Sequence, residues 1–62
     1  MPRFTGTADN GDINIALRLA IEAAKEGLGA DLVVWTMLVV SGANGGVVGQ
    51  NDLTVEIEAS IP

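Results

Sequence analysis

The chain has 62 residues, a formal net charge of −5 and a hydrophobic content of 48%. A chain of this length forms one domain, residues 1–62, and buries only about 60% of the surface that its unfolded state exposes. It contains no cysteine and no histidine, which excludes disulfides and ordinary zinc or thiolate sites. Oligomerisation is the remaining way to stabilise so small a domain.

The charge pattern and the hydropathy pattern limit the classes of partner. The three basic residues form no patch, so we expect no nucleic-acid binding. The sequence has no apolar run of membrane-spanning length and no charged-then-apolar leader at its start. We therefore expect a cytoplasmic protein with no membrane partner.

The start of the chain predicts a short strand followed by a turn. Residues 3–7 are typical of an edge strand, and residues 8–11 combine Asp, Asn and Gly, which turns favour. Asp12 is the expected helix N-cap, because its carboxylate can accept the free amide hydrogens of the first turn. Asp9 and Asn10 are the alternatives for this role.

Residues 13–28 have the periodicity of a helix. Apolar side chains recur at spacings of three and four and form one stripe: Ile13, Leu17, Ala20, Ile21, Ala24 and Leu28. Ile15 and Leu19 widen this stripe beyond what a three-stranded sheet covers, which indicates a neighbouring subunit. Gly27 and Gly29 are expected to end the helix.

Residues 32–41 predict a strand that is apolar on both faces. One face consists of Leu32, Val34, Leu38 and Val40, with Thr36 as its polar member, and the other of Val33, Trp35, Met37 and Val39. A lone domain needs one apolar face per strand. We therefore expect the chain's own helix to cover one face, and a second subunit, a ligand or both to cover the other.

The dipeptide Asn44-Gly45 favours a two-residue hairpin turn. This turn would lead into a final strand over residues 53–61, in which apolar and polar side chains alternate. A longer or bulged loop that includes Gly46, Gly49 and residues 50–52 is the alternative. The predicted fold is α+β: a β-α-β-β unit, with a three-stranded antiparallel sheet packed on one helix.

A turn centred on Asn44-Gly45 fixes the register of the two strands. It places Val34 opposite Val55 on the helix side of the sheet, and Trp35 opposite Thr54 on the side away from the helix. A one-residue slip would mix apolar and polar faces, so this register is the consistent one.

Glu56 and Glu58 share one face of the last predicted strand, roughly 7 Å apart. Paired carboxylates can act in acid–base chemistry or hold calcium. The alternative is a solvated or edge-protecting face. Arg3 is expected close to Glu56 or Glu58 across the sheet.

Trp35, the single tryptophan, is the strongest candidate for a binding residue. Two interpretations are open. The ring packs at a subunit contact, or it is a stacking platform for a planar ligand.

The order and spacing of these features resemble the dodecins, small flavin-binding proteins. The similarity covers nearly the whole chain and includes Gly6-Thr7 after the first strand, the Asp/Asn/Gly turn, the alanine-rich helix, Trp35 in the second strand and the segment Leu53-Thr-Val-Glu-Ile. Dodecins form hollow twelve-subunit shells in which tryptophans paired across two-fold axes enclose stacked flavins.

The resemblance implies a homo-dodecamer that binds or stores a flavin (riboflavin or FMN) or a similar planar molecule without catalysis. Trp35 would stack on the ring, and Val33, Met37 and Thr54 would line the site. Thr54 falls where dodecins have a glutamine that contacts the isoalloxazine edge. Some relatives in the family are linked to calcium, which the acidic residues here would suit.

A second resemblance is to the small amino-terminal-proline tautomerases of the 4-oxalocrotonate type, which also begin Met-Pro. In that case Pro2, exposed by removal of Met1, would act as general base. The simpler interpretation is that Pro2 starts an edge strand.

Overall fold

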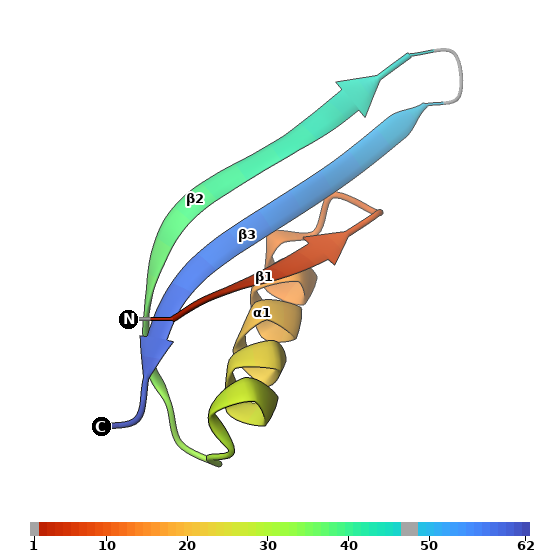
Figure 1. The fold of residues 1–62 in the computed structure, drawn as a ribbon. Helices are drawn as coiled ribbons and strands as arrows, with labels where there is room; N and C mark the ends of the chain where they lie inside the picture. Colours follow the sequence, from red (N-terminus) through yellow and green to blue (C-terminus); the bar gives the residue numbers. More distant parts are fainter. Residues whose placement is uncertain (1, 47–48) are drawn as a thin grey trace.

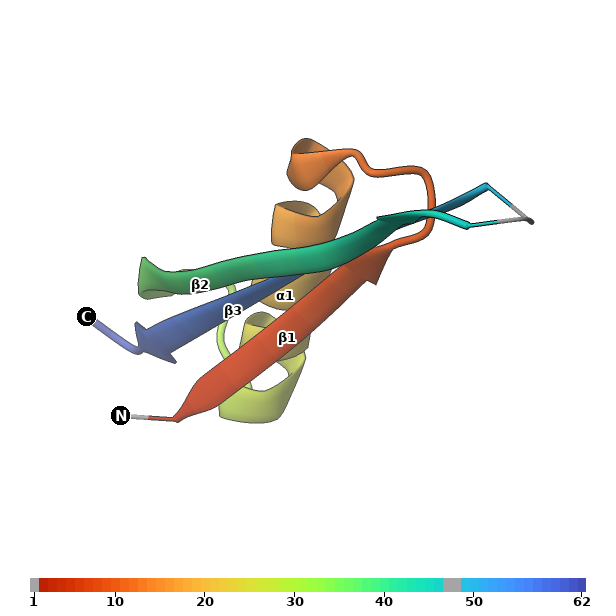
Figure 2. The ribbon, with the colours of Figure 1, turned by 90° about the horizontal axis from the view of Figure 1, so that it is seen from above.

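The computed structural model describes residues 2–46 and 49–62. Its elements are β1 (Arg3–Ala8), α1 (Ile13–Leu28), β2 (Val34–Gly45) and β3 (Gln50–Ser60). The strands form one antiparallel sheet in the order β1-β3-β2, with α1 on one face (Figures 1 and 2). The predicted β-α-β-β arrangement is confirmed. In the described part of the chain, no helix has both the length and the apolar character that crossing a bilayer requires.

The two ends of α1 lie where the sequence predicts them. The Asp12 side chain accepts a hydrogen bond of 2.9 Å from the Asn14 amide, so Asp12 is the N-cap. Asn10, one of the alternatives, instead accepts a hydrogen bond from the Asp12 amide through its own Oδ1 atom. Gly29 ends the helix in the left-handed conformation, with φ of 65°, and its amide donates to the Lys25 carbonyl oxygen.

The contact between α1 and β1 requires small side chains. A Cβ atom on Gly6 would lie 2.1 Å from the Ala16 carbonyl oxygen and 2.5 Å from the Ala20 amide nitrogen. Ala16, Ala20 and Ala24 are completely buried on the side of α1 that faces the sheet. The predicted apolar stripe is therefore only partly right, because it omits Ala16 and includes Ile13, whose exposed fraction is 41%.

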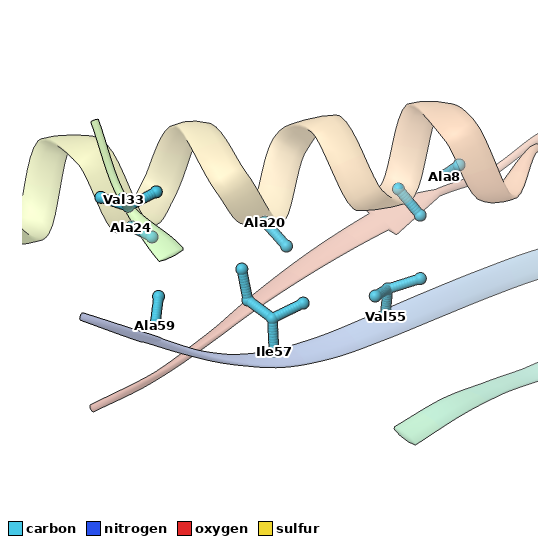
Figure 3. Packing of buried hydrophobic residues seen from close by; sticks show 8 residues of the cluster. Ala8, Ala20, Ala24, Val33, Val55, Ile57 and Ala59 are labelled. Atoms are coloured by element: carbon cyan, nitrogen blue, oxygen red, sulfur yellow. The ribbon is translucent and has the colours of Figure 1, made fainter. Parts of the chain in front are cut away.

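The core lies between this line of alanines and β3. Val55, Ile57 and Ala59 point from β3 toward α1 and are fully buried, and Val33 closes the end beside Ala24 (Figure 3). Val55 and Ile57 are the largest fully buried side chains. The single chain thus encloses a small core.

The hairpin turn does not lie at Asn44-Gly45. Both residues belong to β2, where Asn44 pairs with Asn51 and Gly45 with Gln50. The Asn44 side chain donates to Oδ1 of Asn51 at 3.0 Å, which stabilises the extended ladder at this point. The chain reverses between Gly46 and Gly49, as in the predicted alternative, but residues 50–52, which that alternative placed in the loop, belong to β3. Residues 47–48 lie outside the described residues.

Glycine suits both ends of this reversal. Gly46 and Gly49 have φ of 80° and 67°, conformations that L side chains rarely adopt. The Gly49 amide donates to the Gly46 carbonyl oxygen at 3.2 Å. The hairpin of β2 and β3 therefore continues past the amino-terminal end of α1 (Figure 1).

The shifted turn changes the register of β2 against β3. Val34 lies opposite Ser60 and Trp35 opposite Ala59, so the predicted pairs of Val34 with Val55 and of Trp35 with Thr54 are wrong. A bulge between Met37 and Val39 then shifts the pairing by one further residue.

Candidate functional site

Trp35 lies on the helix side of the sheet. Its cross-strand partner, Ala59, is fully buried against α1, and directly opposite residues share one face of a sheet. The predicted placement of Trp35 on the side away from the helix is therefore wrong. The exposed fraction of Trp35 is nevertheless 39%, because α1 packs on β1 and β3, and β2 is the strand farthest from it (Figure 1).

Two of the other predicted site residues share this face with Trp35. Met37 lies opposite Ile57 and packs, half-buried, against the core. Val33 has an exposed fraction of 8% and belongs to the core itself. Met37 is thus placed to extend a surface around Trp35, whereas Val33 supports that surface from within.

Thr54, the fourth predicted site residue, lies on the opposite face. It is paired with Thr7 on one side and Ser41 on the other, and its Oγ1 atom is 3.0 Å from Oγ1 of Thr7. The structure therefore does not bring Trp35 and Thr54 together. A ligand on Trp35 would have to find its polar contacts elsewhere.

The exposed apolar side chains of β2 form the most unusual surface of the molecule. We call Val34, Trp35, Leu38, Val39 and Val40 the β2 apolar surface; all five are large hydrophobic residues that are exposed. Val34 and Val39 lie opposite Ser60 and Glu56 on the outer face, whereas Trp35 and Val40 lie opposite the buried Ala59 and Val55. The prediction that this strand is apolar on both faces is confirmed. The predicted faces are wrong after the bulge, because Val40 shares a face with Trp35 and Val39 with Val34.

The outer face of β1 and β3 is polar. The Arg3 guanidinium lies between Glu56 and Glu58, with N–O distances of 3.6 Å and 3.9 Å. The predicted proximity of Arg3 to these carboxylates is confirmed. Among the described residues, no group of three or more Asp or Glu side chains is arranged to hold a metal ion.

Pro2 directly precedes β1 and is exposed. Its carbonyl oxygen accepts a hydrogen bond of 3.1 Å from the Ala59 amide, so Pro2 continues the pairing of β1 with β3. This placement agrees with the edge-strand interpretation of Pro2. Its role as a general base stays a prediction.

Within the described residues the surface has no enclosed pocket. Trp35 is therefore a partly exposed aromatic side chain that lies outside any enclosed pocket. Comparison with known proteins adds no information, because no family model, no curated protein and no solved structure matches the chain.

Proposed function

We propose that this protein is a non-enzymatic homo-oligomer that binds a flavin or a similar planar molecule by stacking it on Trp35. The observation that carries this proposal is the partial exposure of Trp35 at an edge strand that α1 leaves uncovered. The one other aromatic residue of the sequence, Phe4, packs against the core. Trp35 is thus the aromatic side chain available for stacking.

Stacking and assembly support each other in this proposal. An aromatic pair contributes about 0.5–1.5 kcal/mol beyond the burial of its area. One indole covers one face of a planar ligand and leaves the other face in water. A second copy that brings its own Trp35, or another part of the β2 apolar surface, would cover the remaining face.

Titration with riboflavin or FMN tests the ligand. Wild-type protein should quench flavin fluorescence, and the flavin should quench the emission of Trp35. That emission can be assigned to Trp35 because the chain has one tryptophan. Trp35→Leu should abolish the quenching of flavin fluorescence. Thr54→Val is the matched control, because Thr54 lies on the other face of the sheet.

Wild-type protein that leaves flavin fluorescence unchanged at every concentration would remove the flavin from the proposal. Loss of binding in Thr54→Val, with an unchanged circular dichroism spectrum, would contradict the location of the site at Trp35.

A purely structural homo-oligomer is the second candidate. The exposure of apolar side chains on both faces of β2 favours it, because burying these side chains against another subunit is favourable whether or not a ligand binds. The two candidates differ in the behaviour of Trp35→Ala. If Trp35 only fills a subunit contact, this variant should dissociate in analytical ultracentrifugation, whereas a ligand platform should lose flavin binding while the oligomer persists.

A further inference from the structure

The two edges of the sheet differ in how they are protected. β1, at one edge, has six residues, follows Pro2, carries Arg3 and packs against α1. Short length, proline and charge are among the devices by which soluble proteins prevent an edge strand from pairing with another chain. The β1 edge has all three of them.

β2, at the other edge, lacks these devices. It has twelve residues, and the sequence from Val34 to Gly45 contains no charged residue and no proline. In the described part of the chain, no strand pairs with its second edge. The bulge at Met37/Val39 twists the strand. It puts no charged side chain at the edge, so pairing with another strand would not have to remove water from a charge.

We infer that β2 pairs in antiparallel orientation with β2 of a second copy, across a two-fold axis, so that two sheets become one. This inference rests on the homo-oligomeric part of the proposed function and names the contact that would build the oligomer. In a two-fold contact each copy presents the same strand. The β2 apolar surface of one copy then meets the β2 apolar surface of the other.

The charge distribution favours a second copy as the occupant. The chain carries a net charge of −5, so most approaches of two copies bring like charges together. β2 carries none of this charge. Three carboxylates lie opposite β2 on the outer face of β3, those of Asp52, Glu56 and Glu58, and Arg3 partly neutralises the last two. β2 is therefore the strand along which two copies approach with the least repulsion.

The size of the contact is adequate for a specific dimer. Antiparallel pairing of two strands of this length forms roughly one backbone hydrogen bond per residue, whereas a typical protein interface has about ten in all. The pairing also covers exposed valine and leucine side chains that the small core of one chain leaves in water.

Cysteine scanning along β2 tests the pairing directly, because the wild-type chain contains no cysteine. Single cysteines are placed at Val34, Thr36, Leu38, Val40 and Ala43, and each full-length variant is incubated with oxidised glutathione. Cross-strand partners have Cα atoms about 4.5–5.5 Å apart, within the range that a disulfide spans. A disulfide-linked dimer should therefore form most rapidly at one position or two adjacent ones, and Thr5→Cys on β1 should remain unlinked.

A charge substitution provides the second measurement. Thr36→Lys places a cation on the free edge, where pairing would bring two lysines together, and it should lower the mass of the particle in analytical ultracentrifugation. Thr5→Lys is the matched control. It has the same residue change on the same face of the other edge strand, and each lysine lies opposite a glutamate, Glu58 for Thr36 and Glu56 for Thr5. The control should keep the wild-type mass.

The outcomes separate this inference from the proposed function. An oligomer that keeps its mass in Thr36→Lys and shows no preferred cross-linking position overturns the pairing of β2 and leaves the homo-oligomer standing. A wild-type monomer at all concentrations overturns both. A variant that loses only flavin binding, with unchanged cross-linking and mass, contradicts neither the pairing of β2 nor the homo-oligomer.

Discussion

Trp35 and Ala59 lie directly opposite each other in the ladder of β2 and β3, the first partly exposed and the second fully buried. The small side chain of Ala59 is buried beneath α1, whereas the indole stays partly exposed because α1 packs on β1 and β3. The register of β2 against β3 determines the face on which Trp35 lies. A slip of β2 by one residue would turn Trp35 to the other face of the sheet.

Gly6→Ala should lower the free energy of unfolding by about 1–3 kcal/mol, because the added methyl group would overlap the Ala16 carbonyl oxygen and force α1 away from β1. The midpoint of urea unfolding measures this effect. Thr5→Ala, one residue earlier on the exposed face, should change stability by less than about 0.5 kcal/mol. Equal midpoints for the two variants would contradict the close contact of α1 with β1.

Ile57→Ala should lower the free energy of unfolding by about 2–5 kcal/mol. The substitution truncates one of the largest fully buried side chains and leaves a cavity beneath Ala20 (Figure 3). Thermal unfolding followed by circular dichroism is the measurement. Ile61→Ala removes the same atoms from a side chain that is 57% exposed, and should have little effect. A cost at Ile61 as large as that at Ile57 would show that a partner covers Ile61.

Asp12→Ala should destabilise the protein by about 1 kcal/mol, because the Asn14 amide loses its hydrogen-bond acceptor at the start of α1. Asp9→Ala is the control, since it removes the same charge from a nearby exposed position. Asp12→Ser should recover most of the loss, because serine also caps helices. No recovery in Asp12→Ser would assign the loss to charge instead of capping.

Asn51 joins the β2–β3 hairpin to the turn before α1. Its Nδ2 atom donates to the Asn10 carbonyl oxygen at 3.1 Å, and its Oδ1 atom accepts from Asn44. Asn51→Asp keeps the acceptor and loses the donor, whereas Asn51→Leu loses both. We expect the stability to fall in two steps of about 1 kcal/mol each in urea titrations, with Asn51→Asp intermediate. Equal values for the two variants would show that the contact with Asn44 contributes nothing.

Local chemistry made the helix predictable. Asp12 and Gly29 are residues that begin and end helices for physical reasons confined to one turn of chain, so the bounds of α1 followed from the sequence. The proximity of Arg3 to Glu56 and Glu58 was predictable for a similar reason, since strand alternation fixes the face on which each residue lies.

The register of β2 was less accessible. Asn44-Gly45 fits a two-residue turn, but the same residues are stable in the ladder because Asn51 binds the Asn44 side chain. The pair of glycines at positions 46 and 49 was the available signal for the longer turn. The residue opposite Trp35 is Ala59 instead of the predicted Thr54. The two are an odd number of positions apart on β3, so the indole lies on the opposite face from the predicted one. Alternation of residue types gave no sign of the bulge.

The alanines of α1 and the glycine of β1 set a limit on how this domain can change. Methyl groups and a bare backbone already fill the gap between helix and sheet, so bulkier replacements there would push the two layers apart. Larger side chains in the core therefore cannot make this domain more stable. During evolution, greater stability would have to come chiefly from contacts at its surface with other subunits.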